Sequence, residues 1–348
     1  MSKPPSLWRR LLGDKKTDSA PSGLARYRRE RLLGQGSMGE VWLATDLETG
    51  APVALKQLAL QREFSPEDRA DVRARFMREA AAAAHLHHPD ILEILATGEA
   101  GEDAWIVMEY VRGHDLSHYS RAGHLLPVPA AIRLGIRLAR ALGHAHAQGV
   151  VHRDIKPANV MYDRASDTLK VMDFGIARLA DGSRTRTGLV LGTPSFMSPE
   201  QLAGLSVDGR SDLYSLGVLL YQLLTGQLPH QAESMARLMQ AIAKQPPPDV
   251  RHFRPELPEA LALVLALALE KHPDLRYRTG EQLAGDLQAV LDQGLPAGLD
   301  VDFDVAPHAP SPHEAPPTVD AFALTQRLDA KEAGQNPPTP PARPHKET

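Results

Sequence analysis

Hydrophobic and polar positions follow a strand-like pattern through the first hundred residues. From Arg31 an apolar stretch, a glycine-rich turn and a second apolar stretch run to Leu43, which predicts two strands joined by a hairpin. Residues 52–56, 91–95 and 104–109 have the composition of further strands. Together these segments predict a small antiparallel sheet.

One helix interrupts this pattern, and it carries a carboxylate on its apolar face. Ser65 is a suitable N-cap and Pro66 a suitable first residue, so we expect a helix from there to about residue 86. Glu79 is the helix's one glutamate beyond its first turn, and it shares a face with Phe76 and Ala83. A buried lone carboxylate is costly, and Lys56, at the end of the strand 52–56, would pair with it.

The second half of the chain has the longer spacing of helices. Residues 128–148 carry an apolar stripe that includes Ile132, Ile136 and Leu142. Further helices are expected at 210–224, 235–243, 258–270 and 280–293, and one strand at 168–172. The sequence therefore predicts an α+β fold, with the sheet in the N-terminal part and helices in the larger C-terminal part.

A polar loop between the helix 128–148 and the strand 168–172 carries the strongest chemical signal. Asp154 and Asn159 lie five residues apart, so a carboxylate that can accept a proton and an amide oxygen that can hold a metal face one point. Lys156 adds a positive charge between them, and Asp173, directly after the strand, suits a Mg²⁺ ligand. This combination suits phosphoryl transfer, which depends on positioning and charge neutralisation.

The glycine-rich turn is the second chemical signal. Gly34, Gly36 and Gly39 would let backbone amides approach phosphate oxygens without an intervening side chain. The spacing alone is weak evidence, because dinucleotide-binding folds use it before a helix. Here a strand containing Val41 and Trp42 follows, which favours a phosphate-binding hairpin. The histidines His144 and His146 are better explained as surface and core residues than as metal ligands, because no third ligand lies nearby.

Composition and charge narrow the function classes. The 348 residues contain no cysteine, which excludes disulfides, thiol catalysis and cysteine-ligated zinc. Residues 1–31 hold nine Lys/Arg against three acidic residues and residues 301–348 hold four against seven, so the body between them has a net charge of −7. That charge argues against nucleic-acid binding. We find neither an apolar run long enough to span a bilayer nor a secretory signal, and we expect a cytoplasmic protein without a transmembrane segment.

These motifs together resemble one family. Residues 152–159 resemble the catalytic loop His-Arg-Asp-x-x-x-x-Asn of the eukaryotic-like (Hanks-type) serine/threonine protein kinases. The glycine-rich turn, Lys56 in a Val-Ala-Leu-Lys frame, Asp173-Phe174-Gly175 and Ser198-Pro199-Glu200 stand in the family's order, across roughly residues 27–293. The resemblance implies a two-lobed fold, with a small β-rich N-lobe containing one helix, a larger α-helical C-lobe and ATP in the cleft between them.

The roles of the site residues are carried over from the family. By this resemblance Asp154 accepts the proton, Lys156 and Lys56 hold phosphates, Glu79 pairs with Lys56, and Asn159 with Asp173 holds Mg²⁺ or, alternatively, Mn²⁺. The residues assigned to nucleotide binding are Leu33, Gly34, Gln35, Gly36, Ser37, Met38, Gly39, Glu40, Val41, Ala54, Lys56, Met108, Glu109, Val111 and Asp115. Asp115 would contact the ribose, although an ordinary N-cap explains it as well.

The resemblance also implies regulation. Residues 173–200 would form an activation segment with phosphorylation sites at Thr185 and Thr187, and Arg153 would pair with the added phosphate. Thr193 would belong to the substrate platform, Glu200 would pair with Arg276, and Asp212 would steady the catalytic loop. Phosphorylation of one molecule by another implies a transient homodimer, and its reversal implies a cognate Ser/Thr phosphatase. The residues Thr185-Arg186-Thr187 resemble bacterial members.

The expected organisation is a flexible basic leader at 1–24, a kinase domain at 25–294 divided at about residue 110, and a disordered proline-rich tail at 295–348. The expected activity is ATP-dependent phosphorylation of protein serine and threonine hydroxyls, including the chain's own activation segment. Two other classes remain open: a nucleotide-binding pseudokinase scaffold and a small-molecule phosphotransferase of the aminoglycoside type. Lys56, Asp154 and Asp173 favour turnover over a scaffold, and Lys156 with the activation segment favours protein acceptors.

Overall fold

The computed structural model describes residues 23–36, 39–58, 67, 69–100, 103–121, 123–174 and 194–299. All of them belong to one of the two units into which the chain divides, Met1–Asp304. Besides the helices and strands below, short 3₁₀ turns occur at η2 (Gly23–Arg26), η3 (His118–Ser120), η4 (Pro157–Asn159), η5 (Pro194–Phe196), η6 (Val250–His252) and η7 (Pro273–Leu275). Within the described ranges, no helix is both long and apolar enough to cross a bilayer.

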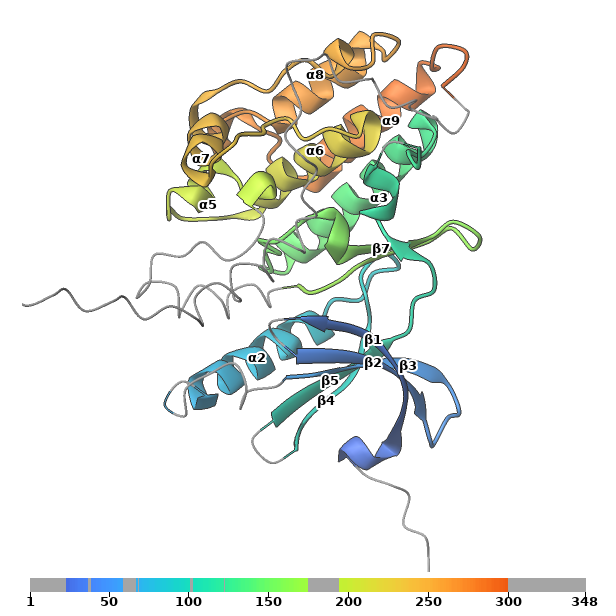
Figure 1. Cartoon of the computed structure of the whole chain (residues 1–348). Coiled ribbons are helices and arrows are strands. Elements are labelled where there is room, and N and C mark those ends of the chain that lie inside the picture. The colour runs from blue at the N-terminus through green and yellow to red at the C-terminus, as the bar shows by residue number, and fades with distance from the viewer. Residues whose placement is uncertain are drawn as a thin grey trace, which may run out of the picture. The chain divides into compact units, whose positions relative to one another are not determined.

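The N-terminal part is a five-stranded antiparallel sheet, as the sequence predicts (Figure 1). Its strands, in spatial order, are β1 (Tyr27–Gly36), β2 (Gly39–Asp46), β3 (Pro52–Gln57), β5 (Asp103–Glu109) and β4 (Ile94–Ala100). The strand expected at 91–95 is wrong by about three residues. Ile91 pairs only with Val171 in an isolated bridge, and the amide of Leu92 donates to the Val171 carbonyl, because this part of the apolar run joins another sheet.

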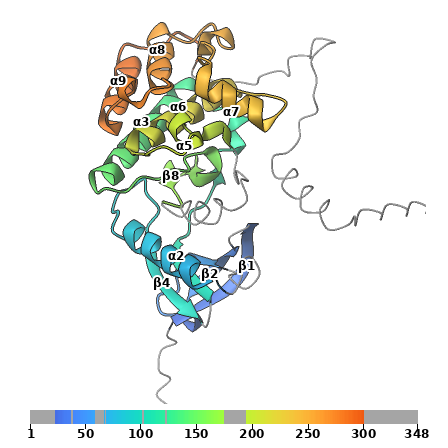
Figure 2. The ribbon, with the colours of Figure 1, turned by 90° about the vertical axis from the view of Figure 1, so that its left-hand side faces the viewer.

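Helix α2 (Arg69–Ala84) covers one face of the five-stranded sheet, as Figure 2 shows. The contact is apolar and contains Leu58, Val72, Phe76, Ala80, Ala104 and Ile106. A second apolar cluster, which includes Tyr27, Leu55 and Trp105, fills the opposite face. The helix begins later than expected, since Glu67 lies in a turn, and the proposed cap residues Ser65 and Pro66 lie outside the described residues.

The C-terminal part is helical. Its helices are α3 (Val128–Ala147), α5 (Pro199–Leu202), α6 (Gly209–Thr225), α7 (Met235–Lys244), α8 (Glu259–Ala268) and α9 (Gly280–Asp292). The five expected helices are confirmed, with ends within two residues of the expected ones. Helix α3 packs against both α6 and α9, segments that are distant in the sequence (Figure 1). The core continues past α9 to Leu299, which is buried and whose carbonyl accepts the Val128 amide at 3.1 Å.

A small second sheet follows α3 and positions the polar loop. It consists of β6 (His114–Asp115), β7 (Val160–Asp163) and β8 (Thr168–Val171). Only β8 was expected; β6, with two residues, is too short to produce any alternation, and β7 directly follows the polar loop and was not identified as a strand. The β7–β8 hairpin brings the chain back beside the loop, where the Met172 amide donates to the Asn159 carbonyl at 2.9 Å. Asp173 is therefore held next to Asn159.

Candidate active site

The polar loop is anchored by one buried carboxylate on α6. Asp212 has no exposed side-chain surface, and it accepts the backbone amides of His152 at 2.8 Å and of Arg153 at 2.7 Å. Arg153 has a φ of 69°, in the left-handed region that side chains other than glycine seldom adopt. Such a conformation persists where surrounding contacts enforce it, so Asp212 determines how the loop leaves α3. This geometry supports the expected steadying role.

His146 and His152 connect this anchor to the rest of the site. The His146 Nε2 atom lies 2.8 Å from Asp212 Oδ2, the oxygen that also accepts the His152 amide. The His152 Nε2 atom lies 2.7 Å from the Met172 carbonyl, while its Nδ1 atom accepts the Asp154 amide at 3.2 Å. The imidazole proton of His152 is therefore assigned to Nε2. The ring links the loop directly to the residue that precedes Asp173.

Among the described residues, donors bond only one of the two carboxylate oxygens of Asp154. Its Oδ2 atom accepts the Lys156 Nζ at 2.8 Å and the Asn159 Nδ2 at 2.9 Å, and Nδ2 also donates to the Asp154 carbonyl. Neither donor bonds Oδ1, which makes this oxygen available for a proton. The side chain of Asp154 is 36% exposed, so an acceptor can reach it. The amide nitrogen of Asn159 is occupied, which leaves its oxygen as the atom that can hold a cation.

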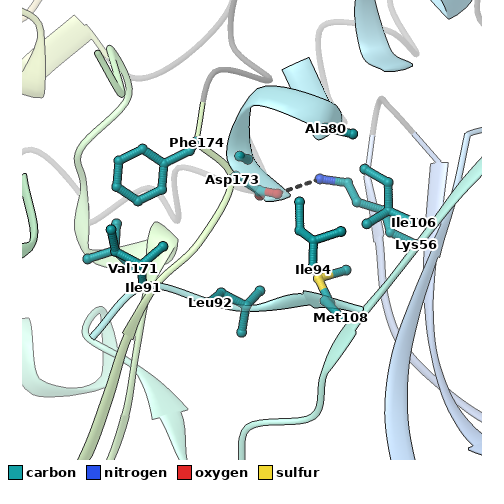
Figure 3. Close-up of a pocket in the computed structure, with 11 residues that line it drawn as sticks. Lys56, Ala80, Ile91, Leu92, Ile94, Ile106, Met108, Val171, Asp173 and Phe174 are labelled. Carbon is teal, nitrogen blue, oxygen red and sulfur yellow. Dashed lines mark hydrogen bonds and ion pairs between the residues drawn. The ribbon is translucent and has the colours of Figure 1, made fainter. Parts of the chain in front are cut away.

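Asp173 and Lys56 face one another across a small pocket. Lys56 Nζ donates to Asp173 Oδ1 at 2.7 Å, and Figure 3 shows the two side chains meeting between Phe174 and Ile106. Asp173 has a φ of 60°. Burial opposes ionisation of Asp173, but Lys56 outweighs burial through charge and hydrogen bonding and lowers the pKa of this carboxyl. Asp173 is therefore a carboxylate, the form that binds a cation.

The expected pair between Lys56 and Glu79 stays a prediction. Glu79 lies in α2, the helix that borders the pocket through Ala80 and Ala83, but its side chain is outside the described residues. The pocket itself has a volume of about 30 Å³. It extends behind Met108 and has a mainly apolar lining.

An apolar cluster lies beside this pocket and shares Leu92 and Met108 with its lining. Ala54, Leu92 and Met108 are buried together, and Val41, Val111 and Met172 pack against them. These side chains come from the five-stranded sheet, the segment before β4, the segment after β5 and the residue before Asp173. A flat apolar ring can pack against such a surface, so the cluster supports the expectation for Val41, Ala54, Met108 and Val111.

The segment that follows Met108 is partly occupied by structural bonds. The Glu109 amide donates to the Glu93 carbonyl at 3.1 Å, and its carboxylate pairs with Lys170 at 2.6 Å. The carbonyl of Glu109 is thus the group it can offer to a ligand. Asp115 Oδ1 accepts the Ser117 amide at 2.8 Å, so this residue caps a local turn. Its expected contact with a ribose stays a prediction.

The glycine-rich turn is described except at its tip. Gly36 and Gly39 pair across β1 and β2, whereas Ser37 and Met38 lie outside the described residues. Gly39 has a φ of 127°, and a Cβ there would come within 2.0 Å of the Gln57 carbonyl oxygen, so no other residue fits. The neighbouring assigned residues Leu33, Gly34 and Gln35 are exposed on β1, and Glu40 accepts the Trp42 indole at 3.1 Å.

A buried ion pair lies below the loop. Arg276 makes two parallel bonds to Glu200, at 2.7 and 2.8 Å, and Ser211 also donates to this carboxylate. Burial opposes ionisation of Glu200, and the bond from Arg276 outweighs burial and lowers the pKa of Glu200. The neighbouring Gln201 donates to the Arg153 carbonyl at 2.8 Å. The expected pair is thus present, and its helix is bonded to the loop.

Three residues of this network were not predicted from the sequence. Three other residues that were predicted cannot be compared with the structure. His146 was interpreted as an ordinary helix residue, and His152 and Gln201 received no role. The signal for His146 was its position in the last turn of the helix that leads into the loop. Thr185, Thr187 and Thr193 lie outside the described residues.

Comparisons with known proteins agree with this geometry. Residues 27–285 match the family model described as a protein kinase domain. Among curated proteins, the chain is 41% identical over 303 residues to the serine/threonine-protein kinase PknJ of Mycobacterium tuberculosis, covering 85% of this chain and 49% of the relative. It is 40% identical over 277 residues to the serine/threonine-protein kinase pkn3 of Myxococcus xanthus, covering 76% of this chain and 50% of the relative.

A third relative is the probable serine/threonine-protein kinase SCO3848 of Streptomyces coelicolor, 41% identical over 280 residues, with 78% of this chain and 41% of the relative covered. The chain thus spans half or less of the length of each of these relatives. The family match covers most of the chain and includes the loop, the glycine-rich turn and Asp173. On this evidence the chain belongs to the protein kinase family.

Proposed function

We propose that this chain is a serine/threonine protein kinase that transfers the γ-phosphoryl group of ATP to hydroxyl groups of proteins. The observation that carries the proposal is the arrangement of Asp154 beside the Lys56–Asp173 pair: Lys156 and Asn159 bond its Oδ2, and no donor among the described residues bonds its Oδ1. Family membership supports the use of ATP, and the names of the relatives support serine and threonine as acceptors.

In this mechanism the chain's own residues position the phosphates and remove the proton of the attacking hydroxyl. Asp154 accepts the proton of the attacking hydroxyl at its free oxygen. Lys156, 2.8 Å from Asp154, is placed to hold the transferred phosphate, and Lys56 holds the α- and β-phosphates. The adenine ring packs against the apolar cluster that contains Ala54 and Met108, with the Glu109 carbonyl and the Val111 amide at its edge.

The donor set fits a divalent cation. The Asp173 carboxylate and the Asn159 amide oxygen are hard oxygen ligands, the kind that Mg²⁺ prefers and Mn²⁺ accepts. Met172, bonded to the Asn159 backbone, keeps the two side chains adjacent. A bound Mg²⁺ would neutralise phosphate charge during transfer.

The decisive experiment replaces Asp154. Asp154→Asn keeps the size of the side chain but removes the proton acceptor, so we expect phosphate transfer to a protein acceptor to fall by about 10²–10⁴-fold while a fluorescent ATP analogue still binds. Asp274→Asn, at an exposed carboxylate far from the loop in sequence, serves as the matched control. Undiminished transfer in Asp154→Asn would contradict the proposal.

The two other classes predict different results for the unaltered protein. A pseudokinase scaffold would bind the analogue without turnover. A small-molecule phosphotransferase would phosphorylate an aminoglycoside and leave protein acceptors unmodified. Measuring both acceptors with the same preparation separates all three classes.

The proposal extends to activation by phosphorylation at Thr185 and Thr187. Arg153 is held at the loop by its backbone, and within the described residues its guanidinium has no ion-pair partner, so it is placed to receive a phosphate. Phosphorylation between molecules in a transient homodimer would make the initial rate rise with more than the first power of protein concentration. Thr185→Ala/Thr187→Ala should then stay at the activity of phosphatase-treated wild type, even after incubation with ATP.

The proposal also includes the expected domain boundaries, partners and substrate-binding surface. The expected kinase domain covers residues 25–294, with a division near residue 110, between a leader at 1–24 and a tail at 295–348; the burial of Leu299 extends the packed part five residues beyond that boundary. Its partners are protein substrates and a phosphatase that reverses the modification. Thr193 contributes to the surface on which the substrate lies.

A further inference from the structure

A second hollow lies between the start of α3 and the β7–β8 hairpin, at residues other than those assigned to the active site. We call it the α3 groove, and its volume is about 400 Å³. Its apolar wall contains Leu126, Pro127 and Leu134. Its charged wall contains Arg133, Arg137, Arg164 and Asp167. A groove with one apolar and one basic wall suits a segment that carries both kinds of side chain.

The arginines of the α3 groove differ in their partners. Arg137 bonds to Asp90 and lies 3.3 Å from Asp167, so its charge is compensated within the fold. Arg133 is exposed, and within the described residues it has no ion-pair partner. Arg164 is exposed in the turn between β7 and β8 and adds a further positive charge. The lining thus contains three arginines and a single carboxylate, and its net charge is positive.

The chain leaves the described fold at the edge of this groove. Leu299 is buried, and its carbonyl accepts the Val128 amide at 3.1 Å. Val128 directly follows Pro127, which lines the groove. Since consecutive Cα atoms are about 3.8 Å apart, the residues after Leu299 need no linker to reach it.

The sequence at this point is Asp300-Val301-Asp302-Phe303-Asp304. In an extended segment, successive side chains point to opposite sides, so the three carboxylates share one side and Val301 and Phe303 share the other. We infer that residues 300–304 dock in the α3 groove, with carboxylates towards Arg133 and apolar side chains towards the apolar wall of the groove. The docked segment connects α3 with the β7–β8 hairpin, the two elements on either side of the loop that contains Asp154.

Hydrogen exchange on the full-length chain tests this inference. In the wild type, the amides of residues 300–304 should exchange more slowly than those of the following tail. Arg133→Glu replaces attraction by repulsion and should accelerate their exchange by about three- to tenfold. Arg237→Glu, also an exposed arginine near a helix N-terminus, should leave it unchanged because α7 does not line the groove.

A double variant in which the two charges are swapped distinguishes direct pairing from a general effect on folding. Asp302→Lys alone should accelerate hydrogen exchange as Arg133→Glu does. The double variant Arg133→Glu/Asp302→Lys should restore a large part of the protection. Unprotected amides at 300–304 in the wild type would overturn the inference and leave the groove to an acidic segment of another protein. Two single variants that accelerate exchange without mutual restoration would also overturn it.

Discussion

Two sets of carboxylates lie within the same part of the molecule and differ in what surrounds them. Asp212 and Glu200 are at most 7% exposed, and each accepts several donors from distant segments. Asp154 and Asp173 are about one third exposed, and the described donors to each side chain bond only one of its two oxygens. The buried set is saturated and determines backbone geometry, whereas the exposed set keeps oxygens free for chemistry. The comparison predicts that the first set controls stability and the second controls turnover.

The largest effect is expected from breaking the buried ion pair at one end. Arg276→Met leaves Glu200 buried without its main partner and should lower the free energy of unfolding by about 3–5 kcal/mol. Urea denaturation measures this loss. The double variant Glu200→Gln/Arg276→Met carries no unpaired charge and should be more stable than the single variant. Equal losses in both would show that the guanidinium acts through packing alone.

Asp173→Asn should affect turnover far more than stability. It removes a negative ligand for the cation, and the rate of phosphate transfer should fall at least about a hundredfold. The pair with Lys56 is partly exposed, so the unfolding free energy should change by about 1 kcal/mol or less. Steady-state kinetics and urea denaturation on the same preparation measure both quantities. A loss confined to stability would place Asp173 in the structural set.

The loss of stability in Asp212→Asn should lie between those in Arg276→Met and Asp173→Asn. The amide offers a single acceptor oxygen, so one of the donors His152, Arg153 and His146 faces an NH₂ group, at a cost of about 1–3 kcal/mol. Turnover should fall as well, because the loop loses an anchor. Asp249→Asn, at an exposed residue that caps η6, provides the control and should cost less. A stable but inactive Asp212→Asn variant would show that positioning dominates its role.

The smallest effect on stability is expected from a change of pH that titrates Glu200. The pKa of Glu200 is lower in the folded state than its ordinary value of 4.5, so at acidic pH the unfolded state binds more protons. The stability due to Glu200 is therefore present above about pH 4.5 and is lost as the pH falls through the folded-state pKa. Urea denaturation between pH 3 and 6 should show a steeper decline for the wild type than for Glu200→Gln. Parallel curves would contradict this assignment.

A separate pH effect is expected at His230. Burial, together with the nearby Lys271, lowers the pKa of His230 from 6.5 to about 4. Between these values the unfolded state binds the extra proton, so stability should rise with pH across this window. In His230→Gln that part of the rise should disappear. An unchanged slope between pH 4 and 6.5 would show that His230 titrates normally in the fold.

Local patterns were sufficient for much of the fold. The hairpin around Gly36 and Gly39 and the five helices expected in the C-terminal part are visible in the sequence because their hydrophobic periods and turn residues are local signals. The strand expected at 91–95 failed because a short apolar run does not reveal its partner. Residues 91 and 92 bond to Val171, while β4 begins at Ile94. The two-residue strand β6 is too short for any periodic signal.

For the site, the sequence by itself determined which residue types stand at Asp154, Lys156, Asn159 and Asp173, because the order of these motifs is a property of the chain. Only the tertiary structure decided which atoms are free. It showed that the described donors to Asp154 bond a single oxygen and that His146 reaches Asp212 from the end of α3. Hydrogen bonds between residues 60 or more positions apart depend on how helices and hairpins pack, and that packing follows from the core as a whole.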